Sequence, residues 1–263
     1  MQPLRIVTSF ILSLLLLTGC DNIEADERLI YQKPEAAQRV VLLEDFTGQR
    51  CVNCPKATEM IEQLQQQYGD NIIAVGIHGG PLGFKGSATL TGLATDVGDE
   101  YYNHWKLEYQ PVGLVNRHGA VNYTDWTTMV KEELVKPAPV SLQVRSYLEG
   151  NVASIYVKAK ATDGNINGKM QVWLVEDSIT AMQLMPDGKA NAEYIHNHVL
   201  RTPVNGTWGQ DFNINEGYTC EFGMTQAIDP SWNLQHLSIV AFAWNDDGVQ
   251  QAIKEPLTIN NKQ

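Results

Sequence analysis

Basic residues are scarce in this sequence. Its 263 residues include 19 Lys and Arg against 30 Asp and Glu, which gives a formal net charge of −11 at pH 7. No stretch of the chain gathers several Lys or Arg side chains. Because nucleic-acid binding draws much of its affinity from Lys and Arg contacts with phosphates, this scarcity argues against a nucleic-acid partner.

Long apolar runs are lacking after the first twenty residues. At the N-terminus, Arg5 is followed by the apolar run IVTSFILSLLLL and then by Thr18-Gly19-Cys20. This order is typical of a secretory signal peptide, and its ending resembles a bacterial lipoprotein cleavage box. We therefore expect residues 1–19 to be a signal peptide and Cys20 to be the acylated first residue. No later run approaches the roughly 20 residues that cross a bilayer, so attachment would rest on the lipid at Cys20.

An acidic segment follows Cys20. Residues 21–27, DNIEADE, carry several carboxylates and show no apolar periodicity. Such a composition cannot bury a core, so we interpret residues 20–38 as a solvated tether.

Cysteine is also scarce, with four residues in the whole chain. Outside the cytoplasm Cys51 and Cys54 are free to form a disulfide, which leaves Cys220 unpaired once Cys20 carries lipid. Three interpretations stay open for the close pair: a redox couple, a structural disulfide, and a corner of a metal site. The metal site would need two further ligands, and no second Cys-x-x-Cys exists. The sequence also lacks a cofactor-binding motif, so neither a metal nor a cofactor is expected.

Strand and helix patterns alternate between residues 39 and 136. Arg39–Phe46 is an apolar run typical of a strand that is buried on both faces. Apolar residues at helical spacing from Ala57 to Tyr68 predict a helix that Gly69 is placed to end. Further predicted elements are a strand at Ile72–Ile77, a weaker helix ending near Trp105, short strands at Val112–Asn116 and Ala120–Asn122, and a closing helix at Trp126–Val135.

After Pro137 and Pro139 the period changes to two, which indicates a domain boundary. About seven alternating segments follow, from VSLQVRSY at Val140 to VQQAIKEPLTI at Val249. They predict an antiparallel β-sandwich over residues 140–260. The immunoglobulin signature of two cysteines around a tryptophan is missing, since only Cys220 is present.

Three features of this second part are candidates for function. His196 and His198, in YIHNHVLR, would project from one face of a strand about 6.6 Å apart and could share a metal ion. No cluster of carboxylates or cysteines lies nearby in sequence, which favours hydrogen-bonded histidines on a polar strand face. Cys220 is interpreted as a buried small apolar residue, with an intermolecular disulfide as the alternative. The segment Ile179–Tyr194 is long for a sandwich connection, which makes it a candidate binding loop.

Residues 39–136 resemble the thioredoxin fold. The resemblance is carried by EDFTGQRCVNC, in which Asp45 stands six positions before Cys51, and by Gln110-Pro111 before the predicted hairpin. It implies that Asp45 is a buried acid and that Pro111 is a cis-proline that faces the cysteines and accepts substrate backbone. The dipeptide Val52-Asn53 departs from thioredoxin itself, so the direction of any redox reaction stays open.

A cysteine pair at the start of a helix suits thiol chemistry. The attacking species is a thiolate, which the free N–H groups and the positive dipole end of a helix N-terminus stabilise. Cys51 would be the nucleophile, and Cys54, further into the helix, would resolve the mixed disulfide. Asp45, if it lies beneath them, would relay the proton that Cys54 loses. The alternatives are a stable disulfide and an acid satisfied by backbone N–H groups.

The leader and the segments EDFTGQRCVNCP, VWLVEDSI and YIHNHVLR together resemble the outer membrane protein twenty-eight family of surface lipoproteins. This resemblance implies a thioredoxin-like α/β domain followed by an all-β immunoglobulin-like sandwich, located at the outer membrane and facing the periplasm or the cell surface. Two functions follow as hypotheses. The first is thiol-disulfide exchange with extracytoplasmic protein clients through Cys51 and Cys54, aided by Pro111 and Asp45. The second is a surface-exposed, adhesin-like binding protein in which the cysteine pair is a structural disulfide.

Overall fold

The computed structural model describes residues 37–259. The expected signal peptide, the acylation site at Cys20 and the tether up to residue 36 lie outside the described residues. The helices are α2 (Cys54–Tyr68), α3 (Asp96–His104) and α4 (Trp126–Leu134), with short 3₁₀ turns at Gly69–Asn71, Tyr123–Asp125 and Leu234–His236. The strands are β1 (Val41–Thr47), β2 (Ile72–His78), β3 (Val112–Val115), β4 (Ala120–Val121), β5 (Val140–Glu149), β6 (Val152–Ala161), β7 (Ile166–Glu176), β8 (Ile179–Leu184), β9 (Ala190–His196), β10 (Val199–Pro203), β11 (Gln210–Ile214), β12 (Thr219–Ala227), β13 (Leu237–Asn245) and β14 (Gly248–Pro256).

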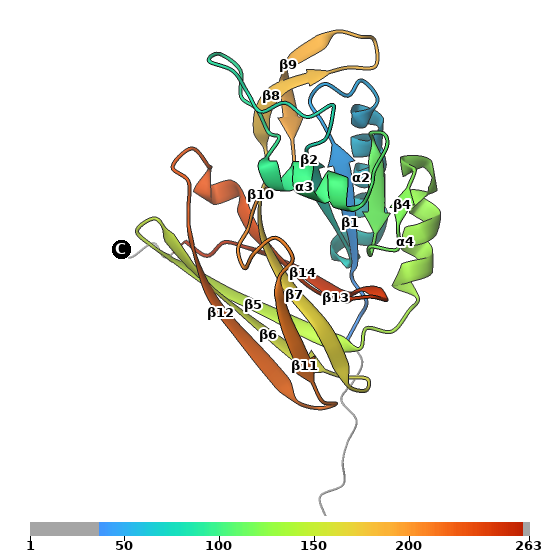
Figure 1. The fold of residues 1–263 in the computed structure, drawn as a ribbon, viewed down its shortest axis with the longest axis vertical. Coiled ribbons are helices and arrows are strands. Elements are labelled where there is room, and N and C mark those ends of the chain that lie inside the picture. The colour runs from blue at the N-terminus through green and yellow to red at the C-terminus, as the bar shows by residue number, and fades with distance from the viewer. Residues whose placement is uncertain (1–36, 260–263) are drawn as a thin grey trace, which may run out of the picture. The chain divides into compact units, whose positions relative to one another are not determined.

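The first four strands lie side by side in the order β2-β1-β3-β4 (Figure 1). Strands β1 and β2 are parallel, while β3 runs antiparallel to β1. Because side chains alternate along a strand, Val41 and Leu43 pack beneath α2 and α4, whereas Leu42 and Phe46 pack on the opposite face with α3. The strands and helices predicted within residues 39–136 are thus confirmed.

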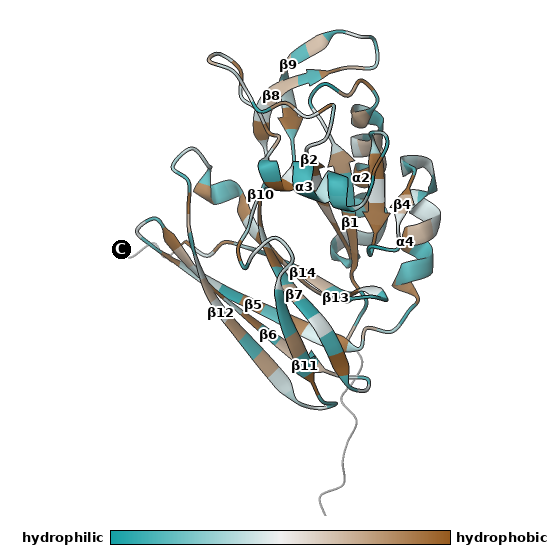
Figure 2. Ribbon diagram, viewed as in Figure 1, coloured by the Kyte–Doolittle hydropathy of each residue, from teal (hydrophilic) through white to brown (hydrophobic). Residues whose placement is uncertain are grey.

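The later strands form two sheets that face each other. The three-stranded sheet β12-β6-β5 packs against β7, β11 and β13 through alternate side chains such as Ile155, Val172 and Ile239. Figure 2 shows brown, hydrophobic segments in many of the strands, while the ribbon of α3 is largely teal. The described chain is therefore rich in β-structure, with several sheets, as the alternating pattern after residue 140 predicts.

One nine-stranded sheet joins the two parts of the chain. Its order is β14-β13-β7-β10-β2-β1-β3-β4, with β11 also paired to β7, and β10 meets β2 where Val199 pairs with Gly76. In β7, Val172 and Leu174 enter the core between the facing sheets, while Trp173 and Val175 pack with the side chains above β1 and β2. The expected division into two domains near Pro137 stays a prediction.

A buried ion pair lies where these parts meet. Arg117, in the turn after β3, donates from Nε and Nη2 to the Glu44 carboxylate at 3.0 Å. Both side chains are buried, and the guanidinium lies against the rings of Trp173, Phe242 and Trp244. These contacts fix β1 to strands that follow it by more than a hundred residues.

The segment Ile179–Tyr194 forms the hairpin of β8 and β9, which pair only with each other among the described strands. The expectation that His196 and His198 share one strand is wrong. Strand β9 ends at His196, and His198 has a φ of 54°, a left-handed conformation that breaks the strand before β10 begins. The two rings therefore do not project side by side.

Candidate functional site

The cysteine pair lies at the N-terminus of α2. Cys51 and Cys54 form a disulfide, and the Cys51 N–H donates to the Gly48 carbonyl at 3.0 Å. Cys54 is the first residue of α2 and Pro55 the second, a place where the helix needs no N–H. Each cysteine is only 2% exposed. The pair is thus positioned for thiolate stabilisation by the helix but is covered in this conformation.

The β8–β9 hairpin closes on the cysteine loop, together with the segment from Leu82 to Leu93, which bonds to Gln49 and Arg50. Gln183 Nε2 donates to the carbonyls of Cys51 at 2.9 Å and Gly48 at 3.3 Å, and the Leu184 N–H donates to the Gln49 carbonyl at 2.8 Å. In return, Gln49 Nε2 donates to the Met182 carbonyl at 2.9 Å. The sequence singles out this hairpin as a binding loop but gives no signal for its target, because Gln49 and Met182 are 133 positions apart.

Asp45 lies under the start of α2. It has the same orientation as Val41 and Leu43, and its neighbours in register, Gly76 on β2 and Gly113 on β3, offer no side chain to pair with its carboxyl group. The side chain is buried, and Oδ1 has no hydrogen-bond partner among the described residues. Burial alone raises the pKa of Asp45 to about 7, because the charged carboxylate is poorly solvated there.

Pro111 follows a cis peptide bond from Gln110 and is buried next to the end of β1. The next residue, Val112, pairs with Phe46. The Gln110 side chain donates to the carbonyls of Thr47 at 2.7 Å and Gly79 at 3.0 Å. This amide therefore joins the ends of β1 and β2 and fixes the segment that carries Pro111.

A cavity of about 30 Å³ lies beside the disulfide, and its lining includes Asp45, Cys54, His78 and His196. The two histidine rings are 5.3 Å apart between centroids in an edge-to-face arrangement. Burial, and secondarily the charges of His196 and Arg201, lower the pKa of His78 well below its ordinary value. Burial likewise lowers the pKa of His196 to about 4. Sequence reasoning missed His78, because a single histidine at a strand end carries no distinctive pattern.

His198 lies at the foot of the hairpin. Its N–H donates to Asp177 Oδ1 at 2.6 Å, and its Nδ1 lies 3.1 Å from the same oxygen. Lys254 Nζ donates to Asp177 Oδ2 at 3.0 Å. Although burial opposes it, the hydrogen bond with His198 and the charge of Lys254 hold the pKa of Asp177 well below its usual range. These contacts anchor the hairpin where it leaves the sheet.

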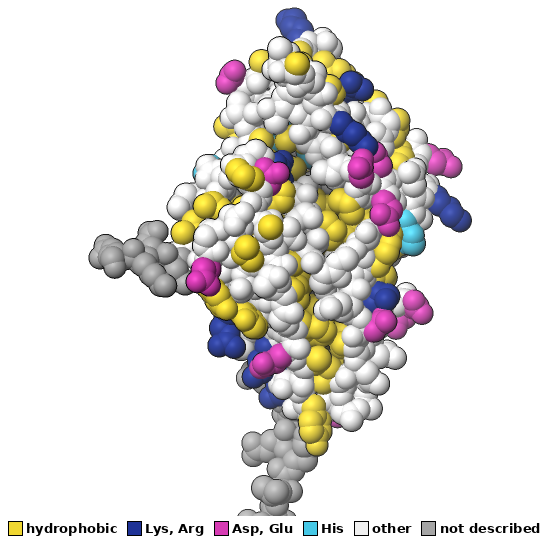
Figure 3. All heavy atoms as spheres, turned by 60° about the vertical axis from the view of Figure 1, so that its left-hand side comes forward, with side chains coloured by type: hydrophobic (Ala, Val, Ile, Leu, Met, Phe, Trp, Pro, Cys, Tyr) yellow, Lys and Arg dark blue, Asp and Glu magenta, His cyan; other side chains and the backbone are white. Residues whose placement is uncertain are grey.

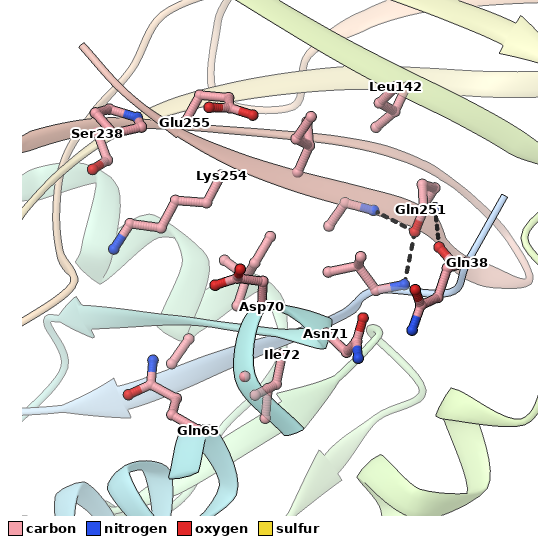
Figure 4. A pocket seen from close by; sticks show the side chains of 17 residues that line it. Gln38, Gln65, Asp70, Asn71, Ile72, Leu142, Ser238, Gln251, Lys254 and Glu255 are labelled. Carbon is pink, nitrogen blue, oxygen red and sulfur yellow. Dashed lines mark hydrogen bonds between the residues drawn. The ribbon is translucent and has the colours of Figure 1, made fainter. Parts of the chain in front are cut away.

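A larger hollow of about 770 Å³ lies elsewhere, between the end of α2, β2 and β14 (Figure 4). The Gln251 side chain forms part of its wall. Its Oε1 accepts hydrogen bonds from the N–H groups of Val40 and Ala252, and its Nε2 donates to the Gln38 carbonyl. Lys254, which also lines the hollow, is already paired with Asp177. The hollow is also lined by Asp70 and Glu255 but by neither cysteine, so it is not the site of the cysteine chemistry.

The remaining candidates have structural surroundings. Cys220 on β12 is free and half-buried, and it packs against the core between the facing sheets. Within residues 37–259, no three His, Cys, Asp or Glu side chains are arranged to hold a metal ion. In the same range, no helix is long and apolar enough to cross a bilayer. On the face drawn in Figure 3, dark blue Lys and Arg side chains are interspersed with magenta Asp and Glu.

Comparison with known families identifies the chain's relatives. The sequence profile described as "Outer membrane protein Omp28" matches residues 98–260, from within α3 to the end of the described chain and just beyond it. The chain belongs to the Omp28 family. Its location at the outer membrane follows from this membership, as the resemblance implies. The Omp28 match begins after the cysteine pair, so the family relationship itself rests on the region that supplies the hairpin.

Solved structures resemble this Omp28 member over most of its length. HBP35 of Porphyromonas gingivalis has a TM-score of 0.65 and 13% identity, covering 87% of this chain and 80% of that chain. Protein AGR_C_4864 from Agrobacterium tumefaciens has a TM-score of 0.55 and 16% identity, covering 87% of this chain and 98% of that chain. At these identities the likeness concerns the fold alone. No curated protein sequence matches significantly.

Proposed function

We propose that this outer membrane protein carries out thiol-disulfide exchange through Cys51 and Cys54. In this proposal, residues 39–136 are a thioredoxin-like domain and the later strands an immunoglobulin-like sandwich. The strand order β2-β1-β3-β4, the cysteine pair at the start of α2 and the position of Pro111 beside β1 support that description. A disulfide in this setting is both oriented and polarised by the helix that follows it.

The observation that carries the proposal is Asp45. A carboxyl group that is buried with an unpartnered oxygen lowers the stability of the fold, and acids with strongly perturbed pKa values are enriched at functional sites. A structural disulfide would need no acid beside it. An acid with a pKa near neutrality that shares a cavity with Cys54 is suited to exchange a proton with that cysteine.

The exchange proceeds in two steps. A client thiolate attacks Cys51 Sγ, the Cys51–Cys54 bond breaks, and the Cys54 sulfur keeps the electron pair and takes a proton supplied by Asp45. A second client thiolate then attacks the mixed disulfide, so the client leaves oxidised and the cysteine pair reduced. The same steps run backwards when a client disulfide is reduced.

Access to Cys51 requires that the hairpin move. Gln183 and Leu184 close over the cysteine loop by hydrogen bonds to backbone carbonyls, which can be exchanged for water at modest free-energy cost. The open form would expose the backbone of the cysteine loop, from Gly48 to Cys51, to a client chain.

Trapping tests this function. In cells that make the full chain, Cys54→Ser should accumulate mixed disulfides with envelope proteins through Cys51, and thiol reductants should release them. The matched control is the Cys51→Ser/Cys54→Ser double variant, which leaves Cys220 in place. The wild-type pair should also have a reduction potential between about −270 and −120 mV in glutathione buffers, the range of known exchange proteins. Adducts absent from Cys54→Ser, or equally present in the control, would contradict the proposal.

A second candidate is a surface binding protein with a permanently closed disulfide. The 2% exposure of Cys51 favours it, because no client sulfur reaches that atom in the closed conformation. A reduction potential below about −300 mV, together with normal partner binding by Cys51→Ala, would support this function instead.

A further inference from the structure

Three buried polar atoms without partners converge on the cavity beside Cys54. They are Asp45 Oδ1 from β1, His78 Nδ1 from β2 and His196 Nε2 from β9, and none has a hydrogen-bond partner among the described residues. His198 also lines the cavity, but its Nδ1 lies 3.1 Å from Asp177 Oδ1 and is not counted with them. Each alone would destabilise the fold, since an unsatisfied buried polar group keeps its desolvation penalty. Three around one cavity indicate a common ligand.

The cavity has the size and chemistry for one water molecule. Its volume of about 30 Å³ exceeds the roughly 10–15 Å³ that a single water requires. A buried water also needs two to four polar partners, and the three atoms provide them. The Cys54 sulfur lies on the same lining, so a water here has both a proton donor and proton acceptors within its shell.

The hairpin fixes the proton-accepting nitrogen of His196. Burial lowers the pKa of His196, and hydrogen bonds with the backbone of Ala181 and Met182 oppose that shift, so in these bonds the ring donates and the carbonyls accept. The bonded nitrogen is therefore Nδ1, which leaves Nε2 as the lone-pair nitrogen in the neutral ring. Burial keeps both His78 and His196 neutral near pH 7.

We propose that His196, assisted by His78, is a positioning residue that holds a water between Asp45 and Cys54 and so routes the proton of the exchange reaction. When the disulfide opens, Asp45 gives its proton to this water, and the water gives one of its protons to the Cys54 thiolate; the reverse transfer occurs when the disulfide forms. The inference rests on the proposed function, and it makes the C-terminal part of the chain a component of the redox site.

The charged and titratable groups around this water come from each element packed on the cavity. They are Cys54 from α2, Asp45 from β1, His78 from β2, Tyr194 from β9, His198 between β9 and β10, and Arg201 from β10, with Glu59 and Glu62 of α2 acting on Tyr194. Burial raises the pKa of Asp45 to about 7, and the protonation of this carboxyl group should govern the pH dependence.

The test is the rate at which dithiothreitol reduces the disulfide in the full chain, held in detergent micelles, between pH 5 and pH 9. Rates are divided by the thiolate fraction of the reagent, and products are counted by acid quench and thiol alkylation. In the wild type the corrected rate should fall as pH rises through about 7, where Asp45 loses its proton. His196→Leu should slow reduction by at least about tenfold and abolish this inflection, since proton transfer by a positioned group contributes about a hundredfold or more. His196→Gln, which keeps an acceptor near Nε2, should retain most of the rate.

If His196 only held the hairpin in place, its replacement would change the rate of disulfide reduction in the opposite direction. Because His196 bonds the hairpin backbone, its loss would then loosen the cover and speed reduction. Faster or unchanged reduction in His196→Leu would overturn the inference, as would equal slowing in the matched control His236→Leu. Dithiothreitol reduction needs no client, so a failure of Cys54→Ser trapping would contradict the exchange function while leaving this result independent.

Discussion

Replacing Asp45 by Asn should stabilise the oxidised protein, by an amount that grows with pH. The folded protein holds the Asp45 proton up to a pKa of about 7, whereas the unfolded chain releases it near 3.8. Between these values the folded state binds one proton more than the unfolded state, so the free energy of unfolding falls as pH rises. Asn has the shape of the protonated acid but cannot ionise.

The magnitude follows from the separation of the two pKa values. Each unit of pKa difference corresponds to about 1.36 kcal/mol. Asp45 therefore lowers the free energy of unfolding of the wild type by about 4 kcal/mol at pH 8, and this loss vanishes below pH 4. His78 and His196 act in the other direction, because their lowered pKa values make the unfolded state the better proton acceptor up to about pH 6.5. Both proteins share that contribution, so it cancels in the difference between variant and wild type.

Urea unfolding of the oxidised full chain, followed by tryptophan fluorescence, measures this difference. Asp45→Asn should match the wild type within about 1 kcal/mol at pH 4 and exceed it by about 4 kcal/mol at pH 8. Asp246→Asn, at an exposed loop position, is the matched control and should stay within about 0.5 kcal/mol throughout. A difference that is equal at the two pH values would refute the assignment of Asp45 as a strained acid.

Three further changes test other contacts. Gln183→Ala removes two hydrogen bonds to the cysteine loop, which together contribute about 2 kcal/mol to the closed conformation. The variant should therefore speed reduction of the disulfide by dithiothreitol about thirtyfold. An unchanged rate would show that the hairpin does not limit access to the disulfide. Glu44→Gln should lower the free energy of unfolding by about 3–5 kcal/mol, because it leaves the Arg117 guanidinium buried and unpaired. Adding Arg117→Met should recover most of this loss, and a double variant without recovery would contradict this account. Gly113→Ala would bring a methyl group within 2.6 Å of the Trp126 ring, and urea titration should detect a loss of about 1–3 kcal/mol rather than a neutral change.

The sequence predicts the parts of this molecule that depend on local order. The resemblance of EDFTGQRCVNC to the thioredoxin fold predicts that Asp45 is a buried acid, and helical spacing from Ala57 predicts the helix that follows the cysteines, so these residues are found without tertiary information. The pairing of Gln183 with the cysteine loop joins residues more than 130 positions apart, and no periodicity reports it. His196 illustrates the limit most clearly. Its strand ends just before the left-handed residue His198, and its ring packs against His78, which stands 118 positions earlier in the chain, so no local pattern reports the contact.

The sharing of β7 between two cores limits how this protein can evolve. Val172 and Leu174 are constrained by the facing sheet, while Trp173 and Val175 are constrained by the side chains above β1 and β2. A recombination event that joined residues 39–136 to the strands of a distant relative would therefore bring together mismatched surfaces along the whole of this strand. Residues 39–136 and the later strands must therefore evolve together, and substitutions in β7 should be accompanied by compensating substitutions around Leu42 and Phe46.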